Sequence, residues 1–340
     1  MTALDFRVPF TGFADLSFYN CFASAYVYLK GFEEVTDYDC ARKNGGQCTG
    51  CGNCRQTLSA IQEDWYFIFG TLTGDFSHWE SFDGTAVKVP HEDEKYVDFC
   101  MKLAGFAYQK ITSDFKSALT ASIANARPAI AVLKDRKKGA CRLLVGYDED
   151  AVFIANPQGS QNGDAVAPRY DEIDYMYVIT DCGEPTRTLL DGLKNIERTL
   201  VSVLDGGVWE DFRRRFTFWD GLKDRPFEDT KAVFARATQL CWNFDHCHNV
   251  AETFRHQVFP ALCDDRLRTY LNAIDYAYDS SHTCQWAMMA LHDCRDWSKR
   301  EWESKEAGMC LYAEWTIDQL KKNDEDVLAA VRGMIQILEK

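Results

Sequence analysis

Short runs of apolar, β-type residues lie in the first half of the chain. They cover residues 129–133, 142–147, 151–155 and 175–179, and each is bounded by Pro, Gly, Asp or Asn. Only Asp148 to Asp150 separate the second run from the third, so these two predict a tight antiparallel hairpin. Apolar residues at helical spacing predict three helices in the same region, at residues 20–30, 58–69 and 114–126.

After about residue 183 the apolar spacing becomes helical throughout. One stripe consists of Leu189, Leu193, Ile196, Leu200 and Leu204, and further stripes follow at residues 234–242, 267–278, 284–291 and 327–338. The chain is therefore predicted to be α+β. We expect residues 1–183 to form a domain with a small antiparallel sheet and a central helix, and residues 184–340 to form an all-α helical bundle.

The composition is that of a packed globular protein. Hydrophobic residues make up 46% of the 340 positions, and the formal charge is −14, which disfavours a nucleic-acid or anionic-membrane partner. No apolar run approaches the ~18 residues of a membrane span, and residues 1–20 lack the pattern of a signal segment. We therefore expect a cytoplasmic protein whose 14 cysteines are free thiols and metal ligands rather than disulfides.

Cys21 lies at the start of the first predicted helix. Asn20 is the predicted N-cap, and Gly31 is a stop signal after Leu29 and Lys30. A thiol in the first turn of a helix lies near the positive end of the helix dipole, which lowers its pKa, and catalytic cysteines use this placement. The alternative is that Cys21 is an ordinary buried thiol that acts as a small hydrophobic residue.

Two later segments extend this pattern, IANARPAIAVL at 123–133 and CRLLVGYDEDAVFIANPQG at 141–159. Together with the preceding Cys21 they resemble the papain-like cysteine peptidase clan over about residues 10–180. Within it the resemblance is closest to the bacteriocin-leader peptidase branch and to the N-terminal domain of butirosin-type acyltransferases. The resemblance implies that Cys21 is the nucleophile and that Asn156 orients the catalytic histidine.

Two positions depart from the pattern of this clan. Its histidine would fall at Ala140 or Cys141, and Asp15 lies where the oxyanion-hole glutamine is expected. A displaced base would have to come from His78 or His91, the N-terminal histidines. If Cys141 replaces the histidine, its sulfur would lie near that of Cys21, which allows a disulfide or a shared metal ion. The alternative is that they are two unrelated core thiols.

A cluster of cysteines, in the spacing C-x7-C-x2-C-x2-C, is the sharpest local motif. It consists of Cys40, Cys48, Cys51 and Cys54, with glycines between them that permit tight turns. Four sulfurs without a competing histidine predict a structural zinc site. An iron-sulfur cluster and four unligated thiols are the alternatives.

The C-terminal half carries a second group of candidate ligands. His248, Glu252 and His256 share one helical face, which indicates either a metal site in the bundle or a solvated surface. Trp297, Trp302 and Trp315 are predicted to pack between helices or at a homo-oligomer interface.

Three functions are consistent with these residues. The first is a degenerate papain-like domain that binds a peptide or a small acyl ligand. The second is an active thiol amide hydrolase or acyltransferase that uses Cys21. The third is a structural zinc protein that mediates assembly.

Overall fold

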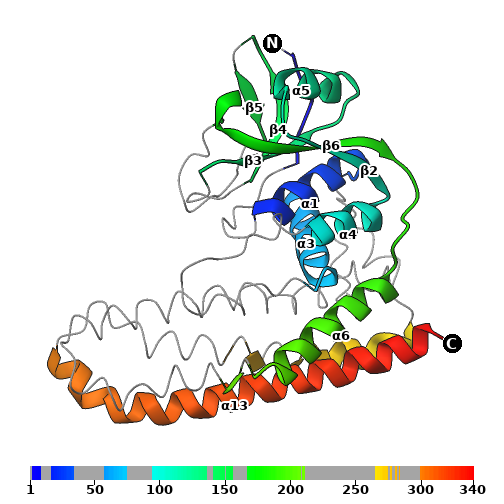
Figure 1. Ribbon diagram of the computed structural model, residues 1–340. Helices are drawn as coiled ribbons and strands as arrows, with labels where there is room; N and C mark the ends of the chain where they lie inside the picture. The colour runs from blue at the N-terminus through cyan, green and yellow to red at the C-terminus, as the bar shows by residue number, and fades with distance from the viewer. Residues whose placement is uncertain are drawn as a thin grey trace, which may run out of the picture. The chain divides into compact units, whose positions relative to one another are not determined.

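A computed structural model describes residues 2–8, 17–33, 57–74, 94–135, 141–149, 151–155, 167–207, 209–210, 265–274, 276–277, 280–281, 283 and 299–340. These residues belong to two compact units (Figure 1). The first unit contains every described strand and the helices α1, α3, α4 and α5, and the second contains α6 and α13. Helices combine with an antiparallel sheet, so the predicted α+β class is confirmed.

The described residues of the first unit form a sheet of six strands. They are β1 (Thr2–Ala3), β2 (Phe106–Ile111), β3 (Ala129–Leu133), β4 (Cys141–Tyr147), β5 (Val152–Ile154) and β6 (Ile173–Cys182). The order is β1-β4-β3-β6-β2, β5 also pairs with β4, and every pairing is antiparallel. The predicted hairpin is confirmed: Tyr147 lies opposite Val152, and the Asp148 N–H donates to the Ala151 carbonyl at 2.8 Å.

The two faces of the sheet are covered by different helices (Figure 1). Helix α5 (Phe115–Ala124) packs on one face, where its Leu119 shares a core with Met176. Helix α1 (Ser17–Leu29) packs on the other, where the Phe18 and Tyr177 rings lie 6.0 Å apart. Met176 and Tyr177 are consecutive in β6, and neighbouring side chains of a strand point to opposite faces. The sheet is therefore the middle layer of the unit.

Helix α1 lies between the sheet and α3 (Leu58–Leu72) (Figure 1). Aromatic rings fill the contact between the two helices, with Phe22 and Phe69 at 4.7 Å and Tyr26 and Trp65 at 4.4 Å. Phe22 is fully buried, and a side chain of this size contributes roughly 1.5–3 kcal/mol when it is removed from water. A helix that is apolar on nearly every side is stable only when it is enclosed in this way.

Helix α1 begins earlier than the sequence predicted. It starts at Ser17, so Asn20 lies inside the helix rather than at its N-cap, and Cys21 is in the second turn. The reason is packing: the Phe18 ring stacks 5.8 Å from Phe22 and also contacts Tyr177, so burial extends the helix toward its N-terminus.

Helix α4 (Glu94–Ala104) and strand β2 follow one another and were not predicted. Strand β2 is at the end of the sheet, pairs with β6 alone among the described strands, and has Phe106 as its one buried residue. An edge strand with polar residues on its exposed side lacks the continuous apolar run by which the other strands were recognised.

The second unit is helical where it is described. Its elements are α6 (Leu189–Asp205), a 3₁₀ turn (Asp265–Leu267), helical residues 268–274 and α13 (Lys299–Leu338). The predicted stripe of α6 buries Leu193, Ile196 and Leu200, with Val203 in place of Leu204. The predicted helices at 234–242 and 284–291 lie outside the described residues. Among the helices that are described, none is both long enough and apolar enough to cross a membrane.

Candidate functional site

Cys21 and Cys141 lie on facing layers of the first unit. Both thiols are fully buried, neither is in a disulfide, and α1 packs directly on β4. Cys141 is the first residue of β4 and lies opposite Val132 of β3, which in turn lies opposite Tyr175 of β6. Tyr175 is two residues from Tyr177 and shares its face of the sheet. This register directs Cys141 toward α1, the helix that carries Cys21.

The surroundings of Cys21 favour the protonated thiol. Burial raises its pKa well above the usual range, the nearby Cys141 raises it further, and the positive charge of Arg142 opposes them only in part. The sequence prediction that the helix dipole lowers this pKa is wrong, because Cys21 lies in the second turn and is removed from water. A protonated thiol is a poor nucleophile.

Tyr175 and Tyr177 extend the row of polar side chains from Cys141 toward the edge of the sheet. Tyr177 is fully buried, and burial raises its pKa, as do the charge of Tyr175, a hydrogen bond with the Tyr175 side chain and the charge of Cys141. The Lys110 ammonium lies 4.4 Å from the centre of the Tyr175 ring and 2.7 Å from the Glu94 carboxylate. Polar side chains thus lead from the Glu94–Lys110 ion pair, through the two tyrosines, to the thiols.

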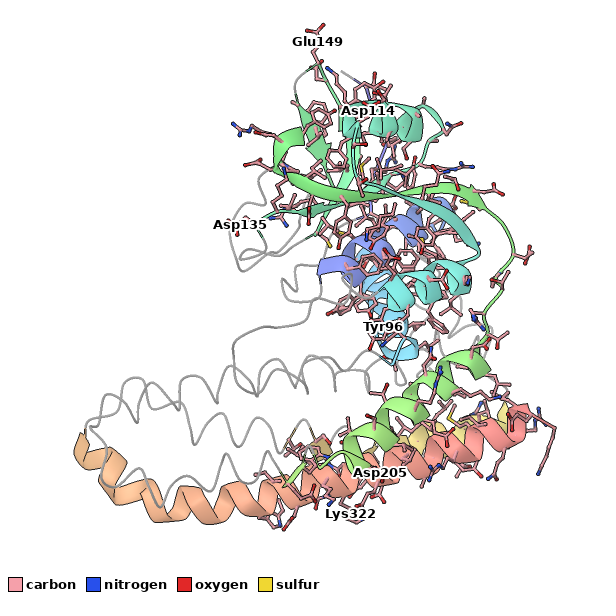
Figure 2. All side chains as sticks on the ribbon, viewed as in Figure 1. Tyr96, Asp114, Asp135, Glu149, Asp205 and Lys322 are labelled. Carbon is pink, nitrogen blue, oxygen red and sulfur yellow. The ribbon has the colours of Figure 1, made fainter. Side chains whose placement is uncertain are left out.

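No carboxylate or imidazole is among the described groups that shift the Cys21 pKa. Asp114 and Glu149 lie on the α5 side of the sheet, away from α1 (Figure 2). Asn156, Ala140 and the histidines His78 and His91 lie outside the described residues. Asp15 and the stripe His248, Glu252 and His256 lie outside them as well.

A hydrogen bond between two buried amides beside Cys21 was not predicted from the sequence. Gln62 of α3 donates from Nε2 to the Asn20 Oδ1 at 2.7 Å, and the Ser24 hydroxyl donates to the Asn20 carbonyl at 3.1 Å. All three residues are buried. The bond from Gln62 joins α3 to α1 next to Cys21, and the bond from Ser24 lies within α1. The polar Gln62 within an apolar helical run was the available signal.

The metal-site prediction is corrected by the structure. Within the described part of the chain, no group of three or more His, Cys, Asp or Glu side chains could hold a metal ion. The four described thiols, Cys21, Cys100, Cys141 and Cys182, are distributed over α1, α4, β4 and β6 rather than gathered around one point. Cys40, Cys48, Cys51 and Cys54 lie outside the described residues. We therefore withdraw the zinc and iron-sulfur predictions, including a metal shared by Cys21 and Cys141.

No protein-family model matches the chain, and no curated protein matches it significantly. The relationship to papain-like peptidases therefore rests on the residues quoted from the sequence and stays a prediction.

Proposed function

We propose that the first unit is a papain-like domain with a degenerate thiol centre, which binds a peptide or a small acyl ligand without attacking it. The observation that carries the proposal is the environment of Cys21. This thiol is fully buried, its pKa is raised by burial and by Cys141, and no base is among the described groups that act on it.

The order and placement of the elements support the papain-like part of the proposal. The helix that carries Cys21 is enclosed between α3 and an antiparallel sheet. The strand β4 begins at Cys141, and this residue faces the same helix. In the resemblance drawn from the sequence, these two positions belong to the nucleophile and the histidine.

The chemistry of the thiols supports the degenerate part. Attack on a carbonyl requires a thiolate and a group that takes up and returns a proton. An unperturbed thiol with a pKa of about 8.5 is only a few per cent ionised at pH 7, and each unit by which its pKa rises lowers that fraction about tenfold. Cys141 is a poor replacement for the histidine, because an unperturbed thiol is mostly protonated at pH 7 and then has no site that readily accepts the Cys21 proton.

One observation favours the alternative, an active thiol amide hydrolase or acyltransferase. The Arg142 guanidinium lies near enough to lower the Cys21 pKa, and a neighbouring cation stabilises a thiolate. Its effect is smaller than those of burial and Cys141. The alternative therefore requires a base supplied by residues outside the described ranges.

The test measures the pH dependence of iodoacetamide alkylation in the native full-length protein by peptide mass mapping. Cys182 is exposed and serves as the internal reference. We expect Cys21 to react at least tenfold more slowly than Cys182 at pH 7, and a small activated thioester to be bound without turnover. A Cys21 midpoint well below 8.5, or turnover that Cys21→Ala abolishes, would refute the degenerate assignment.

Ligand binding is tested separately by calorimetric titration of short peptides and of the same thioester. We expect the wild type and Cys21→Ala to bind alike, because a degenerate site uses no covalent bond to the thiol. Cys100→Ala, which removes another fully buried thiol on α4, is the matched control for a general loss of packing. Failure of every peptide and thioester to bind would contradict the binding role.

A further inference from the structure

The two thiols of the candidate site lie where helix α1 packs on the sheet, one thiol in each of these two layers. Phe18 and Cys21 are three residues apart in α1 and so share a face of the helix, and Phe18 contacts Tyr177 of the sheet. Cys141 lies on the same face of the sheet as Tyr175 and Tyr177, through the register of β4, β3 and β6. The helix face and the sheet face that meet here each contribute one fully buried thiol that is not part of a disulfide.

We propose that Cys21 and Cys141 are a redox-active dithiol, which a low-molecular-weight disulfide such as glutathione disulfide oxidises to an intramolecular disulfide between α1 and β4. This site goes beyond the proposed binding function and does not depend on it.

The reaction balances in two steps. The thiolate of one cysteine attacks the small disulfide, forms a mixed disulfide and releases one small thiolate. The second cysteine then attacks the protein sulfur of the mixed disulfide and releases the other small thiolate. The protein loses two electrons and two protons, and the small disulfide is reduced to two thiols.

Cys182, another described thiol, has surroundings different from those of this pair. The charged groups that act on Cys182 are Arg127, Lys30 and Asp181, and none of them is a thiol. Cys141, by contrast, acts directly on Cys21. Coupling of this kind between two buried groups requires that they lie close together.

The fold also limits the access of an oxidant to the two thiols. Because both sulfurs are fully buried, an oxidant reaches them only when α1 and the sheet separate locally. A disulfide further requires the two Cβ atoms to approach to about 3.5–4.5 Å. Oxidation therefore fixes the distance between α1 and β4, and a reducing compartment keeps both cysteines as thiols.

The full-length wild-type protein is equilibrated in glutathione buffers of increasing oxidation. The reaction is then stopped with acid, the remaining thiols are blocked with N-ethylmaleimide, and peptides are mapped without reduction. We expect one cross-linked product that joins the peptides of Cys21 and Cys141, and it should appear more slowly than glutathionylation of Cys182. The oxidised protein should melt roughly 5–15 °C higher, because the bond closes a long segment of chain.

Variants supply the control. Cys21→Ala and Cys141→Ala should each abolish the cross-link, whereas Cys100→Ala, which removes a buried thiol of α4, should retain it. The wild type also offers a measurement that needs no variant. Phenylarsine oxide, which bridges adjacent thiols, should protect Cys21 and Cys141 together at one arsenic per pair.

Three results would overturn the proposal. The first is oxidation that yields only mixed disulfides, the second is pairing of Cys21 or Cys141 with other cysteines, and the third is protection of one thiol without the other by the arsenical.

Discussion

Gly105, between α4 and β2, packs against the segment that follows β6, and Gly105→Ala tests that contact. Gly105 has a φ of +75°, and a Cβ atom built on it would lie 2.3 Å from the Gly183 carbonyl oxygen and 2.8 Å from the Glu184 carbonyl carbon. The Gly183 N–H donates to the Gly105 carbonyl at 2.7 Å, and the Thr186 N–H donates to the Lys102 carbonyl at 2.9 Å. The obstacle is backbone, so a side chain cannot simply rotate away.

The expected loss of stability has two parts. A non-glycine residue in the left-handed region costs about 1–2 kcal/mol. Forcing a methyl group into a filled space costs a further 1–3 kcal/mol, roughly. Gly105→Ala should therefore lower the free energy of unfolding of the first unit by roughly 2–5 kcal/mol, a large part of the 5–15 kcal/mol that is typical of a domain.

Gly183→Ala is the matched control, because its Cβ would meet only the Gly105 carbonyl oxygen, at an ordinary 3.8 Å. We expect this variant to be as stable as the wild type or more stable by up to about 1 kcal/mol. Urea unfolding of the full chain, followed by hydrogen exchange in peptides from β2 and β6, assigns the change to the first unit. A difference between the two variants below about 0.5 kcal/mol would refute the reasoning.

Three further predictions concern the backbone, the pH and a buried acid. Ala126 has a φ of +55°, so Ala126→Gly should raise the free energy of unfolding in urea by about 1 kcal/mol. The Cys21 pKa is raised in the folded state. The protonated thiol therefore makes its full contribution to stability below a pH of about 8.5, the pKa of the thiol in the unfolded chain. That contribution is lost as the pH rises through the folded pKa, so the Tm should fall above pH 8.5 more steeply in the wild type than in Cys21→Ala. Trp209 donates from Nε1 to the buried Asp324 at 3.1 Å, so Trp209→Phe should destabilise the second unit by about 1–3 kcal/mol in calorimetry.

Each of these predictions has a control within the chain. Ala121 is exposed in the middle of α5, so Ala121→Gly should lower the free energy of unfolding by about 1 kcal/mol, whereas Ala126→Gly should raise it. Trp315 is 54% exposed, and Trp315→Phe should change stability by less than about 0.5 kcal/mol. Equal effects within either pair, or parallel alkaline melting of the wild type and Cys21→Ala, would contradict the corresponding argument.

The amino-acid sequence alone determined the elements whose apolar residues are contiguous or evenly spaced. Residues 129–133 form β3 as predicted, the hairpin of β4 and β5 is confirmed, and the stripe of α6 begins at Leu189. Their stabilising contacts are repeated along the segment itself, so periodicity is sufficient to identify them.

Tertiary structure decided what depends on partners that are distant in the chain. Helix α1 starts at Ser17 because Phe18 packs on Tyr177, and strand β2 exists because it pairs with β6. The state of Cys21 likewise follows from its burial and from Cys141, whereas its sequence position suggested an activated thiol. A local pattern records which side chains are near one another along a helix or strand, but the dielectric surroundings and the facing groups that set a pKa arise only when the layers pack together.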